Sequence, residues 1–110
     1  MAIYSNLTID QGSTFKADID VTDSDGDALN LAGYTVAGQL RKNYSSSTST
    51  DFTASVTSTT NGTIRISLSA TQTNGLKAGR YVYDVEITSS TGEVTRVLEG
   101  QVEVTPGVTR

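Results

Sequence analysis

The chain has 110 residues, enough for one core, so we expect a single domain over residues 1–110. Twelve acidic and eight basic residues give a formal net charge of −4, and the scattered charges argue against nucleic acid or an acidic membrane surface as a partner. Histidine and cysteine are absent, which excludes Ser-His and Cys-His nucleophiles, disulfides and zinc sites built from those ligands.

Apolar and polar residues alternate in four segments of the N-terminal half, the period of two expected for half-buried strands. The expected inner faces are Leu7 and Ile9; Phe15, Ala17, Ile19 and Val21; Tyr34, Val36, Gly38 and Leu40; and Phe52, Ala54 and Val56. Turn-forming residues at 10–13 and 23–27 separate the first three strands. The polar run at 43–50 predicts a surface loop before the fourth.

A hairpin and a short helix are predicted next. Asn61-Gly62 is a turn dipeptide favoured at positive backbone angles, and it leads into a strand with Ile64, Ile66 and Leu68 in phase. Ser69 and Gln72 then have the spacing of a capping box, which gives two amide donors at the start of a helix their acceptors. Gly75 is expected to stop this helix in a left-handed conformation.

The following strand has the pattern of an immunoglobulin-like corner. The chain turns at Gly79, and Tyr81 occupies the position of a tyrosine corner, whose hydroxyl bonds to upstream backbone. Tyr83 stands where antibody domains carry a cysteine. The inner face of this strand continues with Val85 and Ile87.

The last strand is predicted from about Val94 to Val104, after a turn at 89–92 and before Pro106. Gly100 interrupts it, which indicates a bulge or a close backbone approach. Seven short strands without helical crossovers predict an all-β fold, an immunoglobulin-like antiparallel β-sandwich of about seven strands with one short helical turn.

Two acidic groups are weak candidates for chemistry. Asp23, Asp25 and Asp27 resemble the start of a calcium loop, but Ala28 and Tyr34 occupy the positions that need glycine and glutamate. We therefore expect a solvated hairpin tip and no metal or cofactor site.

Asp84 and Glu86 share one strand face, which favours contact with solvent or a neighbour over a hydrolytic pair. We expect no enzymatic activity.

Two residues are candidates for an interface. Tyr44 is the one tyrosine in a candidate recognition loop, which keeps a carbohydrate-binding module open as the alternative function. Arg96 is in phase with Leu98, so it should face inward or lie along an edge. It would then protect that edge from unwanted pairing or contact a neighbouring subunit.

Residues 76–87 and 92–110 carry a Gly79-x-Tyr81-x-Tyr83-Asp84 core and a closing Val-Thr-Pro-Gly-Val-Thr-Arg. With these motifs the chain resembles small virion structural proteins of tailed, cyanophage-type bacteriophages. It is more loosely similar to the immunoglobulin-like N-terminal domain of phage baseplate upper proteins. The resemblance runs from about Leu7 to Arg110.

This resemblance implies a non-enzymatic virion structural protein. Its place would be head decoration, a tail or baseplate component, or fibre attachment, and its partners other virion proteins, with the chain present as a homo-oligomer or in many copies. The resemblance offers no catalytic or cofactor-binding residues. The chain opens without a basic region followed by an apolar run, so we expect synthesis in the host cytoplasm. The resemblance implies localisation in the virion.

Overall fold

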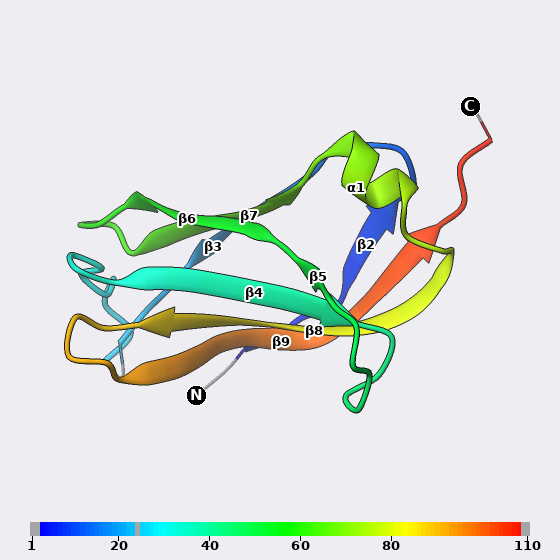
Figure 1. Ribbon diagram of the computed structural model, residues 1–110. Coiled ribbons are helices and arrows are strands. Elements are labelled where there is room, and N and C mark those ends of the chain that lie inside the picture. Colours follow the sequence, from blue (N-terminus) through cyan, green and yellow to red (C-terminus); the bar gives the residue numbers. More distant parts are fainter. Residues whose placement is uncertain (1–2, 24, 109–110) are drawn as a thin grey trace.

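The computed structural model describes residues 3–23 and 25–108 as a two-layered, all-β sandwich of immunoglobulin-like topology (Figure 1). The smaller sheet has the order β3-β7-β6, with bounds Phe15–Asp20, Thr63–Leu68 and Thr53–Ser58. The larger sheet has the order β1 (Ile3–Tyr4), β9 (Val94–Thr105), β8 (Gly79–Thr88), β4 (Thr35–Arg41) and β5 (Thr50–Asp51). Strand β2 (Leu7–Asp10) also pairs with β9.

Most strand pairs are antiparallel as predicted, but the N-terminal strands differ. Both β1 and β2 run parallel to β9, with Leu7 beside Val102 and Asp10 beside Thr105. A parallel pair was expected to need a helical crossover. Here the rest of the sandwich is the connection, because β2 and β9 are close to the two ends of the chain.

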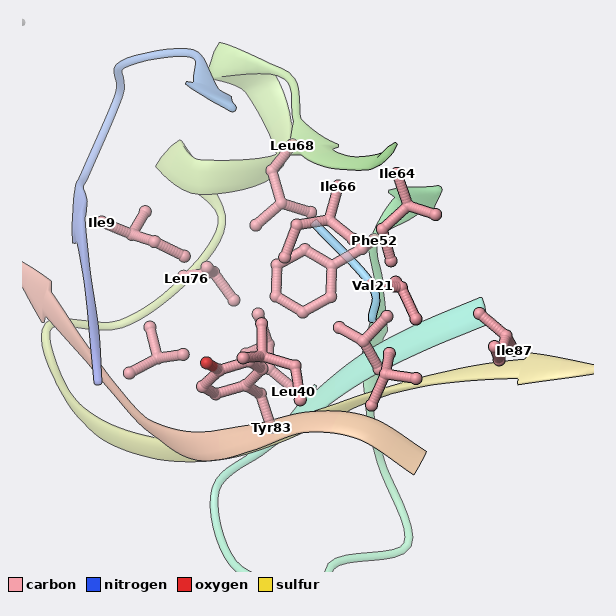
Figure 2. Close-up of a cluster of buried hydrophobic side chains, with 14 of the residues drawn as sticks. Ile9, Val21, Leu40, Phe52, Ile64, Ile66, Leu68, Leu76, Tyr83 and Ile87 are labelled. Carbon is pink, nitrogen blue, oxygen red and sulfur yellow. The ribbon is translucent and has the colours of Figure 1, made fainter. Parts of the chain in front are cut away.

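The core lies between the two inner faces, where the predicted alternation is confirmed. Its fully buried apolar side chains are aliphatic and come from both sheets and from the loop between β3 and β4: Ile9, Leu31, Leu40, Ile64, Ile66, Leu68, Val85, Ile87, Val102 and Val104 are at most 1% exposed. Figure 2 shows several of them, among them Ile9, Leu40, Ile64 and Ile66, pointing into the space between the layers. Burial of this aliphatic surface is the main force holding the two sheets together.

Three aromatic rings pack against one another between the two sheets. The Phe52 ring lies between Phe15 of β3 and Tyr83 of β8, with both centroid separations 6.2 Å. Phe52 was predicted to share a strand with Ala54, but it interrupts that strand. The chain passes at Phe52 from β5 in the larger sheet to β6 in the smaller one, so this ring packs between the layers.

Tyr83 is 4% exposed, and its hydroxyl donates to the carbonyl oxygen of Ser5 at 2.6 Å. Burial raises the pKa of Tyr83 to about 12, aided by nearby Tyr4 and opposed by the Ser5 hydrogen bond. The predicted equivalent of the antibody cysteine therefore joins β8 to the N-terminal segment.

The capped helix and the tyrosine corner are confirmed. In α1 (Ala70–Asn74) the side chains of Ser69 and Gln72 each accept from the other's backbone N–H. The Tyr81 hydroxyl donates to the carbonyl oxygen of Lys77 at 2.8 Å. Gly79 has a φ of 142°, in keeping with the predicted turn.

The prediction of a left-handed conformation at Gly75 was wrong. Gly75 ends the helix with a φ of −79°, and its N–H bonds the carbonyl oxygens of Thr71 and Gln72. The Leu76 N–H then bonds the carbonyl oxygen of Thr73. This tightened right-handed turn directs Leu76 into the core, where it is 7% exposed. A left-handed reversal would send the chain another way.

Only one residue of the Asn61-Gly62 turn has the positive φ that the dipeptide favours. Gly62 has a φ of 67°, but Asn61 does not have a positive φ. The hairpin itself is confirmed, since β6 pairs with β7 in antiparallel register.

A bulge in β9 changes the direction of Arg96. Val85 pairs with Leu98, but the next residue, Glu86, pairs with Arg96, so Val97 is the extra residue of the bulge. The expected phase of Arg96 with Leu98 was therefore wrong. Arg96 points to the outer face, toward Asp84.

Gly100 is the predicted close approach and lies outside this bulge. A Cβ at this position would lie 2.0 Å from the carbonyl oxygen of Ser5. Only glycine allows β9 to come this close to the N-terminal segment.

Candidate functional site

Two hollows flank the polar loop 43–50. The first, which we call the outer groove, has a volume of about 250 Å³ and lies on the exposed face of β4, β8 and β9. Gln39, Asp84 and Glu99 form one cross-strand row in it, and Glu86 and Arg96 lie side by side in the neighbouring row. The groove therefore carries charged and amide groups on rigid strands.

The charges in the outer groove are open to solvent. Arg96 Nε lies 3.4 Å from Asp84 Oδ2, with side chains 54% and 36% exposed. Such an exposed ion pair contributes little to stability. Asp84 is also the direct neighbour of Glu99, an unfavourable like-charge contact that Arg96 partly offsets.

Asp84 and Glu86 lie on the same outer face, as predicted, in this open groove. Asp84 is engaged with Arg96. A hydrolytic pair needs two carboxyl groups that flank the scissile bond of a substrate bound in a cleft. Two neighbouring carboxylates on one exposed strand do not meet that requirement.

Tyr44 lines the outer groove from the loop and is 81% exposed. The loop beneath it is ordered by its own hydrogen bonds, because Asn43 Oδ1 accepts from both the N–H and the hydroxyl of Ser45. Arg41 fixes the loop to β4 by donating to the carbonyl oxygen of Ser46 at 2.7 Å. The predicted interface residues Tyr44 and Arg96 are thus brought to one groove.

The second hollow, the corner pocket, lies between the loop and the turn before β8. It has a volume of about 460 Å³ and is lined by Leu40, Arg41, Lys42, Thr48, Ser49, Thr50, Lys77, Ala78 and Tyr81. Its charged lining residues are all basic. The Lys42 ammonium lies 4.9 Å from the centre of the Tyr81 ring, within range of a cation–π contact.

Sequence reasoning missed the corner pocket. Its cations come from two segments, at 41–42 and at 77, that are far apart in the chain and meet only through the β4–β8 pairing. A local signal existed in the Arg41-Lys42 pair, which is unusual in a chain with few basic residues.

Asp23, Asp25 and Asp27 lie at a hairpin tip, as predicted. It is closed by the Thr22–Ala28 bridge, and Asp23 Oδ1 accepts the backbone N–H groups of Asp25 at 2.9 Å and Asp27 at 3.1 Å. Among residues 3–23 and 25–108, no group of three or more acidic, histidine or cysteine side chains is placed to hold a metal ion.

No helix in the described part of the chain is long and apolar enough to cross a membrane.

Comparisons with known proteins bear on the fold. No protein-family model and no curated protein sequence matches the chain. Among solved structures, it is similar to an internalin-like protein of Listeria monocytogenes, with a TM-score of 0.51 and 17% identity over 94% of this chain. The chain spans 28% of that protein's length. This likeness supports the fold alone.

Two further likenesses are weaker. One is to a structure from a photo-crosslinking study of the multimeric cell-adhesive interactions of VGSC beta subunits, with a TM-score of 0.48, 14% identity and coverage of 93% of this chain and 92% of that one. The other is to a family 123 glycoside hydrolase from Clostridium perfringens, with a TM-score of 0.44, 13% identity and coverage of 97% and 24%. Neither adds an argument about this chain.

Proposed function

We propose that this chain is a non-enzymatic structural protein of a tailed-bacteriophage particle that acts through protein–protein contacts. The resemblance to small virion proteins, which runs from about Leu7 to Arg110, supports the phage setting. The observation that carries the non-enzymatic part is the distribution of polar groups. Among the described residues, the buried polar side-chain groups are the hydroxyls of Thr73 and Tyr83, and both are hydrogen-bonded within the fold.

Protein contact is the use that suits this distribution. Charged side chains of the outer groove, the corner pocket and the hairpin tip lie at the surface, where a partner can reach them. Each exposed contact is weak alone, but a particle presents many copies, and multivalency converts weak contacts into firm attachment. Head decoration, a tail or baseplate position and fibre attachment are all consistent with this proposal.

Mass spectrometry of purified particles tests the proposal. We expect the chain in stoichiometric amounts, retained after repeated washing at physiological ionic strength, with cross-links to other virion proteins that identify its position. Particles that package normally and contain no copies of the chain contradict the proposal.

A second candidate function, a carbohydrate-binding module for host-surface recognition, is favoured by one observation. Tyr44 offers an exposed ring beside Arg41 and the carboxylates of the outer groove. An aromatic face packs on the C–H face of a sugar, and charged or amide groups bond its hydroxyls. A glycan array distinguishes the two functions. Binding lost in Tyr44→Ala supports this candidate, and an array without signal removes it.

A further inference from the structure

The corner pocket is cationic in an acidic protein. Arg41, Lys42 and Lys77 line it, and no acidic side chain is among its lining residues, although the chain carries a net charge of −4. Three hydroxyl side chains, at 48–50, form the rest of its polar wall. The Arg41 guanidinium is engaged with Gln39 and Ser46, so the Lys42 and Lys77 ammonium groups beside these hydroxyls are the groups suited to a carboxylate ligand.

The pocket is also preorganised. The Lys42 ammonium rests over the Tyr81 ring and against the backbone of Gly79, where a Cβ would lie 2.9 Å from Lys42 Nζ. The Tyr81 hydroxyl holds the carbonyl oxygen of Lys77. Groups already held in place lose less conformational entropy when a ligand binds, so fewer contacts suffice for association.

A matching acidic group lies at the other end of the same molecule. The hairpin tip at 23–27 lies in the loop between β3 and β4, whereas the corner pocket lies where β4 ends and β8 begins, so the two are at opposite ends of a sandwich 43 Å long (Figure 1). Asp25 and Asp27 are exposed there. Asp23 is engaged with the tip's own backbone, which leaves Asp25 and Asp27 as the outward-facing acids.

We propose that the corner pocket of one copy binds the acidic hairpin tip of a second copy. Charge complementarity carries this choice of partner, because the pocket lacks acids and the tip lacks cations. Different surfaces meet, so the contact is heterologous and runs head to tail, producing a row or ring of copies. The inference deepens the proposed function and rests on it for the setting on a particle.

Sedimentation velocity over a wide concentration range tests the contact. At low ionic strength we expect the weight-average sedimentation coefficient of the wild type to rise with concentration, and we expect high salt to abolish the rise. The neutral variants Lys42→Gln/Lys77→Gln and Asp25→Asn/Asp27→Asn should each lose it. Lys16→Gln, a lysine on β3 away from the pocket, should behave as the wild type.

Mixing the two double variants gives the sharper result. One has an intact tip and the other an intact pocket, so an equimolar mixture should form a one-to-one dimer and nothing larger. A wild type that stays monomeric at all concentrations, a double variant that still associates as the wild type does, or a mixture that stays monomeric overturns the proposal. Particle mass spectrometry reports on the proposed function separately, so the two failures are distinguishable.

Discussion

The two ends of the sandwich are held together in different ways. At the corner end, side chains make the bonds: Thr73 donates to the carbonyl oxygen of Ser13, Gln11 to that of Leu76, and Tyr81 to that of Lys77. At the opposite end, near the hairpin tip, backbone atoms approach directly, and Gly62 lies against the backbone of Val21 and Leu29. The two ends are therefore sensitive to different substitutions. The corner end depends on its hydrogen-bonding side chains, and the opposite end depends on a glycine.

Replacing Gly62 should have the largest effect on the free energy of unfolding. Gly62→Ala puts a Cβ 2.6 Å from the Val21 carbonyl oxygen at a φ of +67°, so we expect a loss of about 3 kcal/mol in the free energy of unfolding, measured by denaturant titration. Gly26→Ala is the matched control, since its φ is +84° with nothing within 4 Å. It should cost only about 1 kcal/mol. Equal losses contradict the close approach.

At the corner end, Thr73→Val should cost about 2 kcal/mol, because it leaves the Ser13 carbonyl oxygen and the Gly12 N–H without a partner. The isosteric change at exposed Thr71 of α1 should cost less than about 0.5 kcal/mol. Chemical denaturation of both variants measures the difference. A Thr73→Val protein as stable as the wild type would show that these bonds do not hold the corner.

Tyr83 lies between the two ends and predicts a pH dependence. Its pKa in the fold is about 12, above the value of about 10 for an unfolded tyrosine. The stability due to its burial is therefore complete below pH about 10 and falls as the pH rises toward the folded pKa, by about 3 kcal/mol in total. Denaturation at several alkaline pH values measures this loss. Tyr83→Phe should reduce the slope, and an unchanged slope contradicts it.

The smallest effect tests the tyrosine corner. Tyr81→Phe removes the bond to the Lys77 carbonyl oxygen and should cost about 1 kcal/mol in thermal or chemical unfolding. Tyr44→Phe, at an exposed ring, is the control and should cost nothing measurable. If Tyr81→Phe costs no more stability than Tyr44→Phe, the tyrosine corner is not a stabilising feature.

Local patterns in the sequence predicted much of this fold because their physics is local. Alternation assigns an inner face, and the Ser69–Gln72 spacing and the Tyr81 position each depend on a few neighbouring residues. The bulge was missed because Val97 and Leu98 are both apolar and both buried. Nothing in such a pair indicates which residue is extra.

Other features depend on residues distant in sequence. The parallel pairing of β2 with β9 and the meeting of Lys42 with Tyr81 arise only when the whole sandwich has closed. The candidate surfaces were therefore only half foreseen. Tyr44 and Arg96 were identified one by one, but their shared groove and the corner pocket follow from strand register.

The central claim is that the corner pocket of one copy binds the hairpin tip of another. Carbodiimide coupling tests it most directly, because this reagent joins a carboxylate to an amine only when the two are in contact. Equal amounts of isotopically labelled and unlabelled chains are coupled and digested. The account predicts peptides that join Lys42 or Lys77 of one copy to Asp25 or Asp27 of another, since the two ends of a 43 Å molecule cannot couple to each other internally. Coupling that spares these four residues would contradict it.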